Sequence, residues 1–170
     1  MASRGTTFRD AVLPSDPVSV RVLVDSTGFF YPDEIDIAVE LVQERLDRGE
    51  ASDYHFVFAT GPGGEVLGYT CYGPIAGTAE SYDLYWIAVR GTERGGGIGK
   101  SLLAESEERI RHAGGRRVYI ETSSRDLYRP THAFYERRGY RLEATLEDFY
   151  RPGDSKLIYV KVLSASPAAP

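Results

Sequence analysis

One short segment of this chain is rich in glycine, and it is the strongest candidate in the sequence for a binding site. Gly95, Gly96, Gly97 and Gly99 lie between Arg94 and Lys100. A strand-like stretch at 82–89 precedes the segment, and apolar residues at helical spacing follow it. A glycine-rich turn from a strand into a helix leaves bare backbone N–H groups at the positive end of the helix dipole. We therefore expect a phosphate or pyrophosphate group to bind here; the alternative is a merely flexible turn.

Two well-known phosphate motifs do not fit this segment. A Walker loop requires a glycine five residues before Gly99, and Arg94 stands there. The dinucleotide fingerprint fails at its last glycine, where the chain has Lys100. The acid at a suitable distance, Glu121, falls inside the next predicted strand rather than at its end.

The arrangement Arg94-x-x-Gly97-x-Gly99 resembles the acetyl-coenzyme A signature of the GNAT superfamily of N-acetyltransferases. A second stretch, 133–140, resembles that family's short helix carrying Phe-Tyr and ending at Gly-Tyr, and the likeness covers residues 53–163. The resemblance implies that acetyl-CoA is the co-substrate and that it lies between strands 82–89 and 116–123, which pair at one end and splay at the other. The implied coenzyme-binding residues are Ile87, Ala88, Val89, Arg94, Gly95, Gly96, Gly97, Ile98, Gly99 and Lys100.

Acetyl transfer to an amine also requires proton transfer, because an alkylamine with a pKa near 10.4 is almost wholly protonated at pH 7. Asp83 and Glu121 are the carboxylates placed to accept that proton. For each, an exposed strand acid or the partner of an arginine is the alternative interpretation. The resemblance implies that Tyr135 returns a proton to the departing thiolate, although a tyrosine at that position could simply pack in the core.

The acceptor amine is less well specified by the sequence. The resemblance implies an entry between the first helices and the last hairpin, where the candidate wall residues are Phe30, Tyr31, Glu34, Tyr85 and Tyr150. We expect direct transfer, in a ternary complex, to a primary amine of a small molecule or amino acid. The alternatives are a peptide or protein N-terminus or lysine as acceptor, and a non-catalytic module that only binds acetyl-CoA.

Composition sets broader limits on this acyltransferase hypothesis. The net charge of −5 argues against nucleic acid as a partner, and no apolar stretch is long enough to span a bilayer. Cys71 is the single cysteine, so no internal disulfide can form, and no Cys/His cluster has metal-ligand spacing. We expect a cytoplasmic protein that uses no metal, and a homodimer remains open.

The elements that must position these residues follow from apolar periodicity and turn signals. Asp16 is expected to cap the first helix. The fold class predicted with the resemblance is α/β, a GNAT fold with a mixed, mostly antiparallel central sheet, one parallel splayed strand pair and helices on both faces. Residues 1–163 are expected to form one domain, followed by a disordered tail at 164–170. The predicted helices are 17–24, 33–46, 97–113 and 130–139, and the predicted strands are 7–13, 54–59, 66–72, 82–89, 116–123, 140–144 and 156–163.

Overall fold

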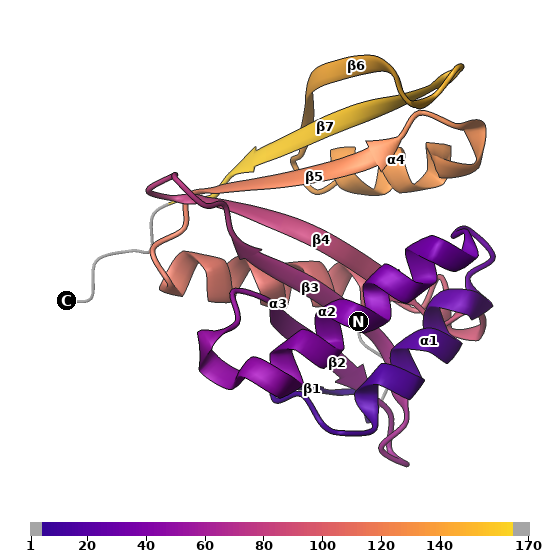
Figure 1. Ribbon diagram of the computed structural model, residues 1–170, viewed down its shortest axis with the longest axis vertical. Coiled ribbons are helices and arrows are strands. Elements are labelled where there is room, and N and C mark those ends of the chain that lie inside the picture. The colour runs from indigo at the N-terminus through magenta and orange to yellow at the C-terminus, as the bar shows by residue number, and fades with distance from the viewer. Residues whose placement is uncertain (1–4, 165–170) are drawn as a thin grey trace. The chain divides into compact units, whose positions relative to one another are not determined.

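The computed structural model describes residues 5–164, and it divides the chain into two compact units. The first unit contains the residues up to Gly73 together with Tyr85–Arg109, and the second contains Pro74–Leu84 and the residues from Ile110 onward. Strand β4 (Ser81–Val89) and helix α3 (Ile98–His112) each begin in one unit and end in the other. Figure 1 labels the elements, and each unit is described by itself.

The strands of the first unit follow the order β1-β2-β3-β4 and pair in antiparallel fashion from β1 to β3. They are β1 (Thr7–Arg9), β2 (His55–Thr60), β3 (Val66–Pro74) and the second half of β4. In this register Phe58 pairs with Tyr69 and Phe56 with Cys71. Because paired residues point to the same face of a sheet, these four side chains form one apolar surface.

Helices α1 (Asp16–Ser26) and α2 (Pro32–Arg48) cover that apolar surface. The opposite face is covered by α3, as the two sides of β3 in Figure 1 illustrate. Gly68 lies so close to α3 that an added Cβ would come within 2.9 Å of a Leu102 methyl group. Beside it, the buried hydroxyls of Thr70 and Ser106 hydrogen-bond at 2.7 Å. The six helical residues that fill the core under α1 and α2 are Val20, Leu23, Val24, Ile35, Ala38 and Val42.

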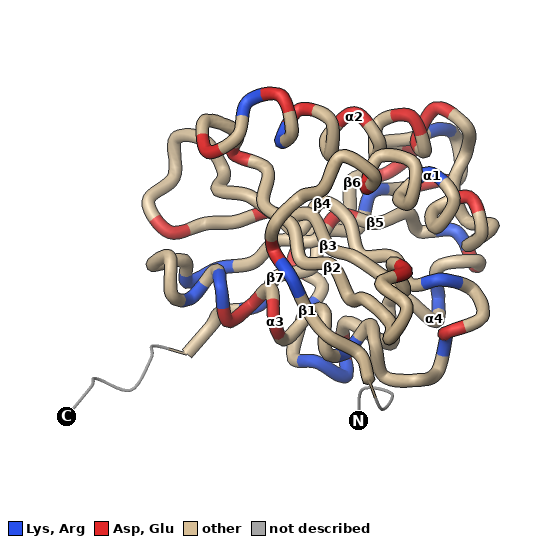
Figure 2. The backbone as a smooth tube through the Cα atoms, turned by 90° about the horizontal axis from the view of Figure 1, so that it is seen from below, with Lys and Arg blue, Asp and Glu red and all other residues tan. Residues whose placement is uncertain are grey.

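Helix α2 is amphipathic, as its sequence pattern predicts. Its buried positions recur at helical spacing, whereas its acidic residues, red in Figure 2, are spread along the rest of the helix. Asp16 corrects an expectation: α1 begins at Asp16 itself, and the N-cap residue Ser15 makes no side-chain cap hydrogen bond. The Asp16 carboxylate is instead buried, where it pairs with Arg9 and accepts the Leu13 N–H at 2.7 Å.

The second unit is built on the strand order β4-β5-β7-β6. Its elements after β4 are β5 (Arg117–Ser123), the short 3-10 helix η3 (Asp126–Tyr128), α4 (Arg129–Glu136), β6 (Arg141–Arg151) and β7 (Asp154–Val162). The first residues of β4, Ser81–Asp83, pair in parallel with Arg117–Tyr119 of β5. β5 then pairs antiparallel with β7 along its whole length, and β6 pairs antiparallel with β7.

Helix α4 lies on one face of this second sheet, as Figure 1 shows beside β5 and β7. The Tyr135 ring lies 6.2 Å from the Tyr159 ring of β7, and the His132 ring stacks on Tyr159 at 5.9 Å between centroids. Tyr159 pairs with Ile120 of β5, so Ile120 shares the α4 face. The neighbouring residues Tyr119 and Glu121 therefore point to the other face.

The predicted fold class is confirmed: the protein is α/β, with a mostly antiparallel set of strands and one parallel pair, β4–β5. Two strand predictions differ by four residues or more at one end. β1 ends at Arg9 rather than residue 13, and β6 extends to Arg151 rather than residue 144. Of the predicted tail, residues 165–170 lie outside the described part of the chain. Within residues 5–164, no helix has the length and apolar character to cross a membrane.

Candidate active site

The glycine-rich segment forms the link between β4 and α3 in the first unit. A short 3-10 helix, η2 (Gly91–Glu93), leads into it, and Gly95 and Gly97 have φ angles of 81° and 84°. Only glycine adopts such angles without strain. The first helical hydrogen bond of α3 runs from the Ser101 N–H to the Gly97 carbonyl at 3.1 Å.

The backbone N–H groups that immediately precede Ser101 are therefore available for a ligand. The N–H groups of Ile98, Gly99 and Lys100 come before the first intrahelical donor, so no helical carbonyl accepts them. They lie at the positive end of the dipole of a 15-residue helix. The buried Ile98 side chain anchors this turn, and the Ile98 backbone N–H lies at the start of α3. A helix start of this kind is favourable for an anion, and anion binding here stays a prediction.

Arg94 connects this loop to the segment between α1 and α2. Its Nη2 donates a hydrogen bond to the Thr27 carbonyl at 2.9 Å, and its guanidinium lies 4.6 Å from the centroid of the Phe29 ring. Both partners lie more than 60 residues earlier in the chain. The predicted coenzyme residue therefore also fixes the position of the loop, which the motif alone does not indicate.

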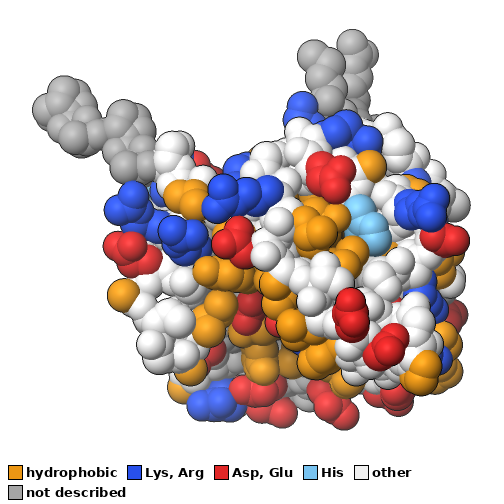
Figure 3. All heavy atoms as spheres, turned by 90° about the horizontal axis from the view of Figure 1, so that it is seen from above, with side chains coloured by type: hydrophobic (Ala, Val, Ile, Leu, Met, Phe, Trp, Pro, Cys, Tyr) orange, Lys and Arg blue, Asp and Glu red, His pale blue; other side chains and the backbone are white. Residues whose placement is uncertain are grey.

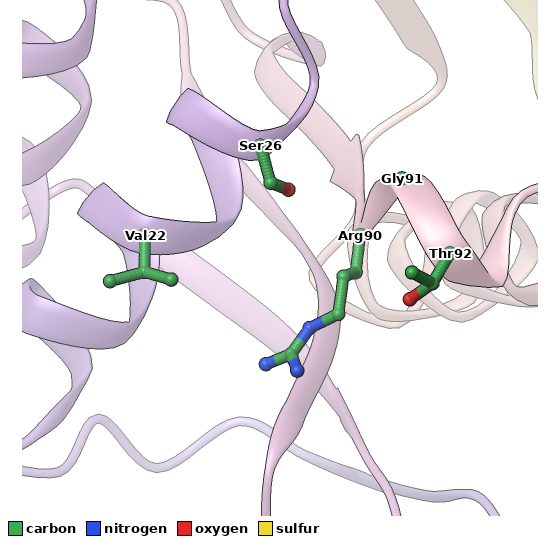
Figure 4. A pocket seen from close by; sticks show the side chains of 5 residues that line it. All are labelled: Val22, Ser26, Arg90, Gly91 and Thr92. Atoms are coloured by element: carbon green, nitrogen blue, oxygen red, sulfur yellow. The ribbon is translucent and has the colours of Figure 1, made fainter.

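A hollow of about 460 Å³ borders the start of the same loop, and Figure 4 shows the residues that line it. Val22 and Ser26 come from α1, and Arg90, Gly91 and Thr92 come from the end of β4 and from η2. The Arg90 Nη2 donates a hydrogen bond to the Val66 carbonyl at 2.9 Å, so the guanidinium is held in place. None of these five residues was predicted as a site residue.

The last residues of β4 lead into this loop. Ala88 is buried, and Ile87 and Val89 on either side of it are partly buried. The Arg90 N–H that follows them donates to the Leu67 carbonyl at 2.8 Å, which ties the end of β4 to β3. The predicted coenzyme strand is therefore anchored up to the point where the loop begins.

The acceptor-wall residues predicted in the first unit are mainly aromatic. Phe30 packs against Trp86 of β4 with ring centroids 4.7 Å apart, and Tyr85, 40% exposed, meets the Tyr54 ring edge-on at 5.5 Å. Glu34 has a structural partner, because its Oε2 accepts the Tyr31 backbone N–H at 2.7 Å. This bond caps the start of α2, where Tyr31 is the N-cap residue.

The two predicted proton acceptors lie on neighbouring strands of the second unit. Asp83 is partly buried, and burial first and the nearby Glu121 carboxylate second raise its pKa from 3.8 to about 6, against an opposing effect of Lys156. Glu121 forms an ion pair with Lys156, with 2.6 Å between Oε2 and Nζ. Lys156 was not predicted as a site residue. It lies 35 residues after Glu121 in sequence, and no local motif marks it.

Tyr135 lies on α4 in the second unit and is 4% exposed. Its ring contacts those of Phe134, Tyr140 and Tyr159. Burial, with a smaller contribution from Tyr128, raises the pKa of Tyr135 well above its ordinary value. The hydroxyl therefore keeps its proton at neutral pH. Tyr135 therefore has the protonation state that a general acid needs. The same residue is also packed among aromatic side chains.

Three other residues with reactive side chains have structural environments. Cys71 is buried, and burial raises the pKa of its thiol, which disfavours the nucleophilic thiolate. His132 Nε2 hydrogen-bonds with the Ser123 carbonyl at 2.9 Å, and His55 stacks on Tyr72. Within the described part of the chain, no group of three or more His, Cys, Asp or Glu side chains is arranged to hold a metal ion.

Comparison with known proteins places these features in a family. The model of the Acetyltransferase (GNAT) family matches residues 21–140. Blasticidin-S acetyltransferase from Streptomyces morookaense is 32% identical over 111 residues, which cover 65% of this chain and 76% of that protein.

Solved structures agree with this assignment. One from Desulfovibrio desulfuricans, described as belonging to the GNAT family, is 49% identical, with a TM-score of 0.92 over 94% of this chain and all of that one. An aminoglycoside 6'-N-acetyltransferase complexed with coenzyme A has a TM-score of 0.76 at 21% identity, over 95% and 98% of the two chains, and shows the shared fold. The chain therefore belongs to the GNAT family of acetyltransferases.

Proposed function

We propose that this acyltransferase moves an acetyl group from acetyl-CoA directly to a primary amine of a small molecule or amino acid. The observation that carries the proposal is the turn from β4 into α3. There, two glycines with positive φ precede three backbone N–H groups that have no helical acceptor. These groups suit the diphosphate of a coenzyme, and family membership points to coenzyme A.

The residues that would hold the coenzyme belong to the loop and the strand before it. The amides of residues 97–100 would receive the diphosphate, and Ile87, Ala88 and Val89 would offer the backbone of β4. Arg94 keeps the loop in place through Thr27. When bound, acetyl-CoA supplies the thioester. Every other part of the reaction is positioning and proton transfer.

We assign the acceptance of the amine proton to Asp83. With a pKa of about 6, its carboxyl is mostly ionised at pH 7 and is still basic enough to take a proton as the amine attacks. Glu121 is the second candidate, and its carboxylate is held in an ion pair with Lys156. We therefore assign the role to Asp83 rather than to Glu121, although the sequence alone favours Glu121.

Tyr135 is proposed to protonate the departing thiolate. A phenol that keeps its proton at neutral pH can donate it to a thiolate formed nearby. The same contacts with Tyr140 and Tyr159 that bury the ring also fix its orientation. A fixed donor is favourable for proton transfer, because no side-chain freedom is lost when the reaction begins.

The acceptor is proposed to be a small amine, on the strength of two kinds of support. Phe30, Tyr31 and Tyr85 in the first unit and Tyr150 in the second each offer an aromatic face, and aromatic faces suit ammonium groups. The names of two related proteins refer to small molecules, blasticidin S and an aminoglycoside. These two compounds differ, so neither is assigned to this chain.

The experiment that tests the proposal is a thiol-release assay with acetyl-CoA and a broad panel of amines. The panel contains free amino acids, polyamines, amino sugars, nucleoside antibiotics and short peptides with free N-termini. We expect release above background for at least one small amine, with the acetylated product identified by mass spectrometry. Acetylation of peptides alone would reject the small-molecule assignment. Tight acetyl-CoA binding without release for any amine would reject the enzymatic function.

A further inference from the structure

A row of charged side chains crosses the sheet of the second unit on the face opposite α4. Asp83 pairs with Tyr119 in the parallel β4–β5 register, and Glu121 lies two residues after Tyr119. Lys156 pairs with Ser123 in the β5–β7 register, and Ser123 lies two residues after Glu121. Because side chains alternate along a strand, Asp83, Glu121 and Lys156 share one face.

The Lys156 ammonium is held from two sides. Its Nζ lies 2.6 Å from Glu121 Oε2 and 3.8 Å from the centroid of the Phe149 ring, with the Tyr150 ring at 5.9 Å. The lysine side chain is 13% exposed, compared with 49% for Glu121. Exposed surface ion pairs contribute little to stability, because solvent screens the charges and both side chains lose conformational freedom. This lysine is already enclosed, so its charge acts at short range and in a fixed place.

The aromatic side of this enclosure comes from β6. Phe149 and Tyr150 are 52% and 44% exposed although both rings lie near the ammonium. Figure 3 shows hydrophobic side chains, in orange, on the face that it views. Tyr150 was predicted as an acceptor contact, which places Lys156 next to the predicted acceptor surface.

We propose that Lys156 is a positioning residue of the acceptor site: its ammonium, fixed between Glu121 and Phe149, holds Glu121 beside Asp83 and balances the negative charge of the two carboxylates. The proposal rests on the proposed amine acetylation, in which Asp83 accepts the proton. Without the lysine, the charge that pairs with Glu121 and lowers the pKa of Asp83 would be lost.

The charge balance predicts opposite effects for two substitutions. The charged groups that face Asp83 are Glu121 on β5, which raises its pKa, and Lys156 on β7, which lowers it. Lys156→Met removes the positive charge and moves the titration of Asp83 to higher pH. Glu121→Gln removes the negative charge and moves it to lower pH. A purely structural role for Lys156 predicts no such opposition.

The experiment follows the Asp83 side-chain carboxyl by carbon-13 NMR through a pH titration of the free protein, with Asp83→Asn identifying its signal. In parallel, the pH dependence of kcat is measured with an amine that the wild-type protein acetylates. We expect Lys156→Met to move both curves to higher pH, and a move of one pH unit would lower the rate at pH 6 by roughly fivefold. Lys156→Arg keeps the positive charge and can also lie over the Phe149 ring, so its Asp83 titration should remain near that of the wild type.

The outcomes separate this proposal from the proposed function. Wild-type activity together with an Asp83 titration that is the same in Lys156→Met, Lys156→Arg and Glu121→Gln would overturn the role of Lys156 alone. A wild-type protein that acetylates no amine would overturn the proposed function, whatever the titrations show. If Lys156→Met fails to fold, Lys156→Gln takes its place, and an Asp83 titration that does not move to higher pH in that variant contradicts the charge balance.

Discussion

The pKa of Asp83 predicts that replacing this residue makes the protein more stable and less active at once. Burial and the Glu121 carboxylate raise the pKa from 3.8 to about 6, so the folded protein binds this proton more tightly than the unfolded chain does. Ionising Asp83 therefore destabilises the fold. The destabilisation is absent below about pH 3.8, develops as the pH rises, and is complete above about pH 6. An asparagine at position 83 stays neutral at every pH, so it does not cause this destabilisation.

The size of the effect follows from the rise in pKa. Each pH unit corresponds to about 1.4 kcal/mol, so the full rise amounts to at most about 3 kcal/mol, less whatever solvent screening removes. For a protein of this length, each kcal/mol moves the melting temperature by about 2–4 °C. Asp83→Asn should therefore raise the Tm by several degrees at pH 8 and leave it unchanged at pH 3.5.

The assay is thermal unfolding of the wild type and Asp83→Asn at both pH values, together with turnover at pH 8. Asp126→Asn serves as the matched control, because the Asp126 side chain is 85% exposed and its ion pair with Arg129 lies at the surface. The control should change neither Tm nor rate. Equal stability of Asp83→Asn and wild type at pH 8 would refute the buried-carboxyl reasoning. Undiminished turnover would remove Asp83 from the proton transfer, where a loss of about 100-fold is expected.

Two further predictions concern the coenzyme loop and the proton donor. Gly97→Asp should lower acetyl-CoA affinity by at least about 100-fold in calorimetry, because a carboxylate would compete for the loop amides. Gly64→Asp, with a nearly identical φ of 82° in the β2–β3 turn, should bind normally, and equal affinities would contradict the assignment. Tyr135→Phe should lower kcat by about 10-fold or more while leaving KM nearly unchanged. Tyr140→Phe, which is buried against the same ring, is its control, and equal rates in both variants would return Tyr135 to a packing role.

Much of the fold could be predicted because its signals are local. The apolar stripe of α2 and the glycines before α3 are read from adjacent residues, and both elements begin within one or two residues of the expected position. The strand β6 could not be bounded in this way. Nearly all of its residues are exposed, and register shifts interrupt its pairing with β7, so no alternation marks its extent.

The candidate site was predictable in part for the same reason. The loop from Arg94 to Lys100 and the landmark around Tyr135 are contiguous motifs, whereas the partners that define their surroundings come from distant segments. The bond from Arg94 to Thr27 and the pair of Glu121 with Lys156 depend on tertiary packing and on strand register. The choice between Asp83 and Glu121 likewise depends on burial, which sequence spacing does not provide.

The central claim is that the backbone N–H groups at the β4–α3 turn bind the diphosphate of coenzyme A. The most direct measurement is a nitrogen-15 NMR titration of the labelled protein with coenzyme A, followed at the amides of residues 95–100. We predict that these amides show the largest and saturable shifts, and that inorganic pyrophosphate moves the same signals more weakly. Saturable binding of coenzyme A with these amides unmoved, or no binding at all, would contradict the account.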